Sequence, residues 1–131
     1  MTTVVFDASA LLALLNDEPG ADVVERLLHS GSGECVASAA NFSEVLAKLI
    51  DRGVAEAAAL QAWRELQVRV VPVGEAEAAA AALLRKSTRA LGLSLGDRCC
   101  LALAQGLTDA RIVTADRAWK ALKGFRFEFI R

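Results

Sequence analysis

Hydrophobic and polar positions follow two patterns along this chain, and their alternation predicts strands and helices in turn. Residues 3–6 (Thr-Val-Val-Phe) form a continuous run of β-favouring residues, as in a strand that is buried on both faces of a parallel sheet. Other segments place apolar residues three or four positions apart, as on one face of a helix. In residues 54–67, for instance, Leu60, Trp63 and Leu66 fall in this register.

Glycine, proline and polar residues separate these segments and set their limits. The predicted strands cover residues 3–6, 34–37, 68–73, 110–114 and 125–130. The predicted helices cover residues 8–15, 21–29, 40–51, 54–67, 75–90, 94–105 and 117–123. Strands that alternate with helices indicate an α/β layered sandwich around a mainly parallel sheet of four to five strands. We expect residues 1–131 to form one domain.

Four acidic residues lie where predicted strands end or predicted helices begin. Asp7 comes directly after one predicted strand, and Asp116 comes two positions after another. Glu44 and Asp97 lie in or near the first turn of predicted helices. In a parallel sheet all of these places belong to one edge. Clustered carboxylates repel one another unless a cation lies among them, and oxygen ligands favour Mg²⁺ or Mn²⁺. Such a site could hydrolyse a phosphodiester, because a bound metal lowers the pKa of a water molecule.

Each acid also has a purely structural explanation. Asp7 and Asp116 precede predicted helices and could cap them. Ser94 and Asp97 have the spacing of a capping box, and residues 41–44 (Asn-Phe-Ser-Glu) are a looser version of it. Three hypotheses therefore stay open: a metal-dependent nuclease, a different metal-dependent phosphohydrolase, and an RNA- or partner-binding module whose acids are only caps.

Hydroxyl and basic side chains near the same edge extend the nuclease hypothesis. Ser9 follows Asp7 by two residues and Thr114 precedes Asp116 by two, so both could contact a ligand carboxylate or a phosphate. RNA binding also needs cations, and three fall near the proposed edge. They are Arg98, Arg117 and Lys120, of which we favour Arg117 and Lys120 for substrate contact. An ordinary solvated surface is the alternative for each.

Composition and charge exclude several other classes of protein and of site. The net charge is −1 and the pI is near 5.8, so any attraction to a polyanion must be local. Three cysteines and one histidine suit neither a disulfide framework nor a zinc site, and they suggest a reducing compartment. We expect no signal peptide, no membrane span and a cytoplasmic location. An aspartyl-phosphate phosphatase would need a second aspartate at position 9, where this chain has Ser9.

Several segments carry a resemblance to a known family. They are residues 5–10 (Val-Phe-Asp-Ala-Ser-Ala), 43–45 (Ser-Glu-Val), 93–102 (Leu-Ser-Leu-Gly-Asp-Arg-Cys-Cys-Leu-Ala) and 113–119 (Val-Thr-Ala-Asp-Arg-Ala-Trp). In this order and spacing they resemble the acidic signature of PIN-domain proteins, and within them the VapC-type ribonuclease toxins of toxin–antitoxin pairs. The resemblance covers nearly the whole chain.

The resemblance implies a three-layer α/β/α sandwich and a metal-dependent ribonuclease. It places Asp7, Glu44, Asp97 and Asp116 at the metal-ligand positions, with Ser9 and Thr114 beside them. It further implies a homodimer and a cognate antitoxin that wraps the toxin and blocks its site. Some PIN proteins carry a further acid shortly after the position of Asp116; here Trp119 lies in that region, which argues against a fully formed second metal site.

Two sets of apolar residues complete the predictions. Trp63 and Trp119 are expected to anchor the core. The helices that carry residues 46–50 and 60–63 could offer an apolar groove to an antitoxin helix, although core packing is the commoner fate of such residues.

Overall fold

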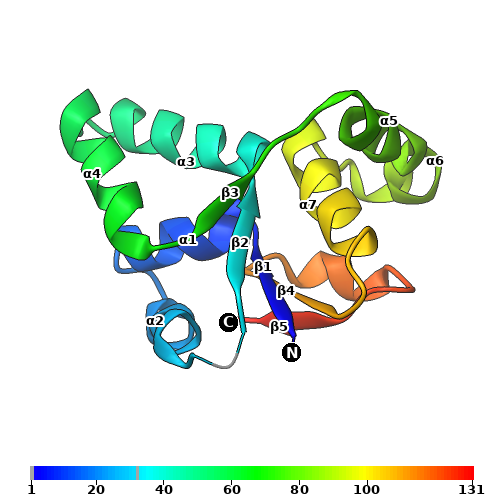
Figure 1. Ribbon diagram of the computed structural model, residues 1–131, viewed down its shortest axis with the longest axis horizontal. Coiled ribbons are helices and arrows are strands. Elements are labelled where there is room, and N and C mark those ends of the chain that lie inside the picture. The colour runs from blue at the N-terminus through cyan, green and yellow to red at the C-terminus, as the bar shows by residue number, and fades with distance from the viewer. Residues whose placement is uncertain (1, 32) are drawn as a thin grey trace.

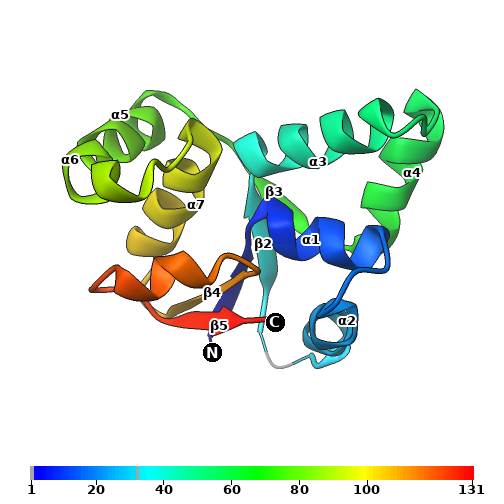
Figure 2. The same cartoon turned by 180° about the vertical axis from the view of Figure 1, so that it is seen from behind.

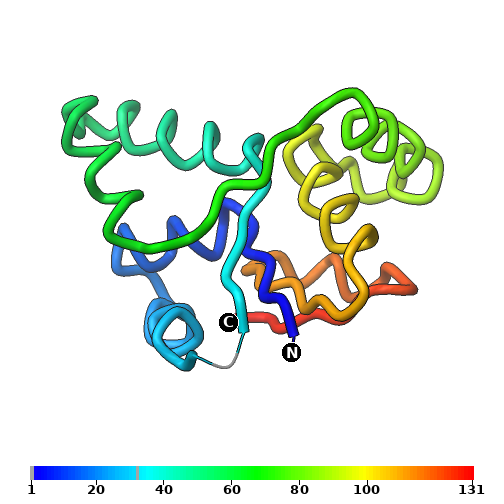
Figure 3. Tube along the Cα trace, viewed as in Figure 1, coloured from blue at the N-terminus to red at the C-terminus, as the bar shows by residue number. Residues whose placement is uncertain are grey.

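A five-stranded sheet, parallel in every pairing, forms the centre of the molecule in the part of the chain that the computed structural model describes, residues 2–31 and 33–131 (Figure 1). The strand order is β3-β2-β1-β4-β5. The strands are β1 (Thr3–Phe6), β2 (Cys35–Ser38), β3 (Arg69–Val71), β4 (Ala110–Thr114) and β5 (Phe127–Phe129). The apolar first strand is thus the central one, as its composition predicts, and the sheet twists from β3 to β5 (Figure 3).

Helices cover both faces of this sheet (Figures 1 and 2). One layer consists of α1 (Ala8–Leu15), α2 (Ala21–His29), α3 (Ala39–Asp51) and α4 (Glu56–Leu66). The other consists of α5 (Glu75–Leu83), α6 (Arg85–Thr88), α7 (Leu95–Gln105) and the 3₁₀ segments η1 (Arg89–Leu91) and η2 (Arg117–Ala121). The predicted three-layer α/β/α sandwich is confirmed.

Two hydrophobic cores lie on opposite faces of the sheet, and β1 contributes to both. Val4 and Phe6 pack against α1 to α4, whereas Val5 packs against the layer that contains α7. Successive side chains of a strand point to opposite faces, so a strand that serves two cores must be apolar throughout. Trp63 belongs to the first core and Trp119 to the second, as predicted.

The helix predicted over residues 75–90 is wrong as a continuous element. The chain instead forms α5, the short α6 and η1, with Leu84 between the first two. The hydroxyls of Ser87 and Thr88 both donate to the carbonyl oxygen of Leu84, at 3.2 and 2.8 Å. Such bonds compete with the helical ladder and bend helices, and here they accompany the break.

Smaller differences concern the ends of elements. The helix expected at residues 117–123 is the 3₁₀ segment η2, and the strand expected at residues 125–130 is reduced to β5. The strand expected at residues 68–73 stops before Pro72, which has no N–H to donate to a neighbouring strand. None of the described helices is long and apolar enough to cross a membrane.

The carboxyl ends of the central strands define the edge at which the functional residues meet. Phe6 at the end of β1 pairs with Val113 near the end of β4. Ser38 ends β2 and begins α3, where its side chain accepts a hydrogen bond from the N–H of Ala40 at 3.2 Å. Each following helix therefore starts at the same edge, as in other open α/β sheets.

Candidate active site

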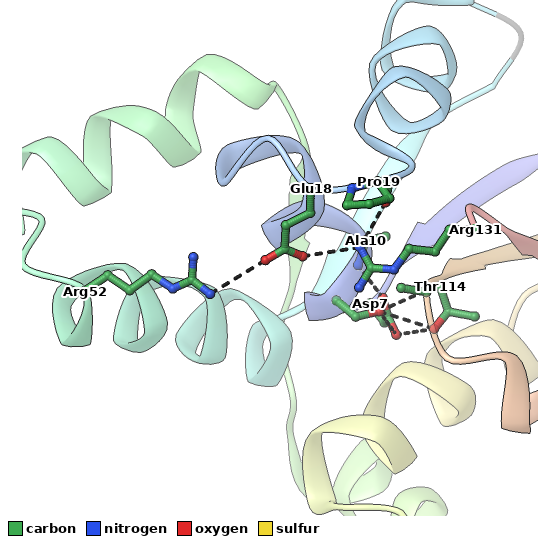
Figure 4. Close-up of polar contacts among 9 residues, drawn as sticks. Asp7, Ala10, Glu18, Pro19, Arg52, Thr114 and Arg131 are labelled. Atoms are coloured by element: carbon green, nitrogen blue, oxygen red, sulfur yellow. Dashed lines mark hydrogen bonds and ion pairs between the residues drawn. The ribbon is translucent and has the colours of Figure 1, made fainter.

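Asp7 is the most enclosed acid of this edge. It follows β1, caps α1 and is only 2% exposed. Its Oδ1 accepts hydrogen bonds from the N–H of Ala10 at 2.9 Å and from the Ser9 hydroxyl at 2.8 Å. Its Oδ2 accepts from the Thr114 hydroxyl at 2.5 Å (Figure 4). It also lies 2.9 Å from the Ser9 hydroxyl. The carboxylate is therefore held by donors from both β1–α1 and β4.

Ser9 and Thr114 also bind the chain that follows β4. The Ser9 hydroxyl oxygen accepts from the N–H of Ala115 at 2.9 Å, and that of Thr114 accepts from the N–H of Asp116 at 3.0 Å. Each hydroxyl therefore has a donor on one side and the Asp7 carboxylate on the other, which fixes the direction of its proton. The structure brings these two hydroxyls together with Asp7.

Burial raises the pKa of Asp7 from 3.8 to about 6. Hydrogen bonds from Thr114, Ala10 and Ser9 oppose this shift because they stabilise the carboxylate, and the negative charge of Asp97 adds to it. A buried carboxylate with a raised pKa gains most from a nearby positive charge. Asp7 therefore has the electrostatic character expected of a ligand for a cation.

Glu44 reaches the edge from α3, and it does not cap that helix, because Ser38 does. The side-chain amide of Asn41 donates to Glu44 Oε1 at 2.8 Å and to the carbonyl oxygen of Gly96 at 3.1 Å. A Cβ atom at position 96 would lie only 2.6 Å from Oε2 of Glu44. Sequence reasoning missed Asn41 and Gly96; a glycine inside the first turn of a predicted helix, where it costs about 1 kcal/mol relative to alanine, was the available signal.

Asp97 and Asp116 both have the capping roles that were the structural alternative. Asp97 Oδ2 accepts from the N–H of Ser94 at 3.0 Å, and Ser94 Oγ accepts from the N–H of Asp97 at 3.2 Å, which completes a capping box. Asp116 is exposed, and its Oδ1 accepts from the N–H of Ala118 at 3.0 Å. Neither role occupies both oxygens of these carboxylates in the described structure.

Three of the four acids converge on one buried thiol. Burial raises the pKa of Cys100 well above its ordinary value, and the charges of Asp7, Asp97 and Glu44 raise it further. Asp116 is not among these charges; it caps the 3₁₀ segment η2. Asp7, Glu44 and Asp97 therefore all act electrostatically on the region around Cys100.

The described residues do not contain three His, Cys, Asp or Glu side chains already gathered in a metal-ligating cluster. The donor chemistry nevertheless fits a hard divalent cation, because the available ligands are carboxylate oxygens. In addition, Oδ1 of Asn41 is a buried acceptor with no hydrogen-bond partner within the described ranges. An acceptor of this kind beside Glu44 indicates a place for a donor or cation that the chain itself does not supply.

The three predicted substrate-binding cations differ in their surroundings. Arg98 turns toward α5, where its Nη1 donates to the carbonyl oxygen of Ala81 at 3.1 Å. Arg117 donates to the main-chain oxygen of Arg131 at 3.0 Å, and its guanidinium lies 5.6 Å from the centre of the Phe129 ring. Lys120 is exposed and has no polar partner in the part of the chain that the structure describes.

Arg131 is a further cation of this edge that sequence reasoning missed. The N–H of Ile130 donates to the carbonyl oxygen of Thr114, so the chain after β5 lies beside the end of β4. The Arg131 guanidinium donates to Glu18 Oε1 at 3.3 Å, and Glu18 also pairs with Arg52 at 3.6 Å (Figure 4). No local pattern marks Arg131, because only the strand order places it here.

Comparison with known structures gives similar folds over almost the full chain. VapBC of Salmonella typhimurium bound to DNA has a TM-score of 0.73 at 17% identity, with 100% of both chains covered. VapC20 of Mycobacterium tuberculosis, described as a sarcin–ricin loop cleaving toxin, has a TM-score of 0.76 at 21% identity, covering 93% of this chain and 95% of that one. FitAcB of Neisseria gonorrhoeae has a TM-score of 0.68 at 18% identity, with 97% of each chain covered.

Comparison with curated proteins finds no match to this sequence. At identities this low, the structural likeness establishes a common fold. A family model of the PIN domain, however, matches residues 4–124, which span β1 through η2 and include all four acids. The chain therefore belongs to the PIN-domain family.

Proposed function

We propose that this protein is an Mg²⁺- or Mn²⁺-dependent endoribonuclease and acts as the toxin of a toxin–antitoxin pair. The observation that carries the proposal is the buried Asp7 carboxylate, held by Ser9 and Thr114 at the carboxyl edge of a PIN-domain sheet, with Glu44 and Asp97 close enough to act on the same buried thiol. Titratable groups whose pKa values are strongly shifted by burial occur preferentially at functional sites.

Asp7, Glu44 and Asp97 are the proposed metal ligands, with Asp116 as a fourth ligand or an outer one. A bound divalent cation would supply a water of lowered pKa and neutralise charge on the phosphate. Ser9 and Thr114 keep Asp7 in one orientation, since the hydroxyl of each donates a hydrogen bond to that carboxylate. Asp7 remains an anion above its pKa of about 6, which is the form that can bind a cation.

The partners follow from the same family. A similar structure from Klebsiella pneumoniae is described as a toxin–antitoxin complex, and VapBC-5 of Mycobacterium tuberculosis as a member of a family of toxin–antitoxin systems. We propose a cognate antitoxin, a homodimer and a cytoplasmic location for this chain as well. The unpaired state of Cys35, Cys99 and Cys100 agrees with a reducing compartment. The apolar groove predicted on α3 and α4 is only partly exposed. Ile50 and Leu60 are 45% and 38% exposed and are available to a partner, whereas Leu49 and Trp63 belong to the core.

A non-catalytic binding module remains the second candidate because Asp7, Asp97 and Asp116 do cap helices. The deciding experiment is RNA cleavage by the purified, antitoxin-free protein with Mg²⁺, Mn²⁺ or EDTA. A pool of structured RNAs that includes tRNA and rRNA fragments is the substrate. We expect cleavage with either metal and none in EDTA. Absence of cleavage together with a melting temperature that Mn²⁺ does not change would favour the binding module.

Lys120 is the predicted cation most available to RNA, since Arg98 and Arg117 already have intramolecular partners. Lys120→Gln is expected to weaken RNA binding and to lower the salt dependence of log K by about one phosphate contact. Affinity is measured against salt concentration in EDTA, where no cleavage is expected. The matched control is Lys86→Gln on α6, and the double variant Arg117→Gln/Lys120→Gln reports on Arg117. An unchanged salt slope for Lys120→Gln would remove it from the interface.

A further inference from the structure

Asn41 is a buried polar side chain that connects two helices of the proposed site. It lies in the first turn of α3 and is 1% exposed. Its amide nitrogen donates both to Glu44 Oε1 and to the carbonyl oxygen of Gly96 in α7. A carbonyl can only accept hydrogen bonds, and so can an ionised carboxylate. The orientation of the Asn41 amide is therefore determined by its partners.

Gly96 leaves room for the Glu44 carboxylate, which packs directly against it. A Cβ atom at this position would lie 2.5 Å from Cδ of Glu44 and would overlap the carboxylate. Gly96 does not adopt the left-handed backbone conformation that favours glycine, so its backbone alone does not require it. The space taken by the Glu44 carboxylate explains why a glycine stands in the first turn of α7.

The two contacts leave one side of the carboxylate unused. Asn41 binds Oε1 of Glu44, while Oε2 has no hydrogen bond to any residue in the described ranges. We infer that Asn41 and Gly96 are positioning residues for Glu44: together they hold its carboxylate in one place, with Oε2 left for a divalent cation. This inference rests on the proposed function, because it assigns Glu44 to that metal site.

Metal binding tests the inference without any need for RNA cleavage. Mn²⁺ alone is titrated into the antitoxin-free protein by calorimetry, well below the melting temperature of each variant. Asn41→Ala and Gly96→Ala are each expected to weaken Mn²⁺ binding about 10-fold or more, as loss of a ligand-orienting contact typically does. Each has a matched control: Asn16→Ala at the end of α1, and Gly106→Ala at the far end of α7, where a Cβ would meet only ordinary contacts of 3.6 Å.

A double-mutant cycle separates positioning from general structural damage. If Asn41 acts through Glu44, Asn41→Ala should cause little further loss of Mn²⁺ affinity in a Glu44→Gln background. Fully additive losses would overturn the inference, and so would a folded Asn41→Ala variant with the Mn²⁺ affinity of the wild type. Should Asn41→Ala not fold, Gly96→Ala decides the matter in the same way, since it leaves the Asn41 side chain in place.

Failure of the proposed function would look different. A wild-type protein that binds Mn²⁺ with this dependence on Asn41 and Gly96, yet cleaves no RNA, would support the inference and contradict the ribonuclease. Metal-dependent cleavage with Mn²⁺ affinity unaffected by either variant would support the ribonuclease and contradict the inference. A wild-type protein that binds no Mn²⁺ would overturn the inference.

Discussion

Asp97→Asn is expected to reduce metal-dependent RNA cleavage by at least about 100-fold, because loss of a ligand should cost no less than loss of a ligand-orienting partner. The amide has nearly the shape of the carboxylate and can still accept a hydrogen bond from Ser94, so the capping box that starts α7 is largely retained. The charge that acts on Asp7 and Cys100 is removed. The measurement is the initial rate of cleavage of the same RNA pool with Mg²⁺ or Mn²⁺.

The control for this prediction is Asp109→Asn. Asp109 lies before β4, at the opposite edge of the sheet, and its exposed carboxylate pairs with Arg126 at 2.8 Å. We expect this variant to cleave RNA at the wild-type rate, since an exposed pair contributes little to stability. A wild-type rate in Asp97→Asn, with both variants folded, would return Asp97 to a purely capping role and would contradict the proposed metal site.

The second large effect is an inverted pH dependence of stability that originates from Asp7. Its pKa is about 6 in the folded protein and near 3.8 when exposed, so between these values the folded state binds more protons than the unfolded state. The contribution of Asp7 to the free energy of unfolding therefore falls as the pH rises from about 4 to above 6, by about 3 kcal/mol in total. For most acids with stabilising partners, the contribution to the free energy of unfolding instead increases as the pH rises.

The difference between wild type and Asp7→Asn isolates this contribution from the other carboxylates. Urea unfolding in EDTA should show the variant gaining stability relative to the wild type as the pH rises from 4 to 7.5. Mn²⁺ at pH 7.5 should then stabilise the wild type and have much less effect on the variant, because the cation binds the ionised carboxylate. A stability difference that does not change with pH would contradict the raised pKa of Asp7.

The local pattern predicted the layered fold well because each layer depends on short-range regularities. The run from Val4 to Phe6 is apolar at every position, which favours a strand with cores on both faces, and β1 is indeed central. The helix starts at Asp7 and Ser94 were visible for the same reason, since a cap bonds to residues only three positions away.

The same local reasoning failed where one sequence pattern is compatible with two different structures. An alanine-rich segment predicts a long helix, yet Ser87 and Thr88 bond back to Leu84 and the helix breaks there. Residue order also does not reveal that Arg98, which directly follows Asp97, donates to the carbonyl oxygen of Ala81 in α5. Helix phase relative to a neighbour is set by packing and cannot be obtained from residue order alone.

The sequence by itself determined most of the elements, their α/β order and the placement of acids at junctions between strands and helices, because these depend on neighbours within a few residues. Only the tertiary structure decided which side chains share a site. Thr114 reaches Asp7 across 107 positions, and Asn41 reaches Gly96 across 55. Such contacts arise from strand order and from the packing of α3 against α7, so no local pattern specifies them.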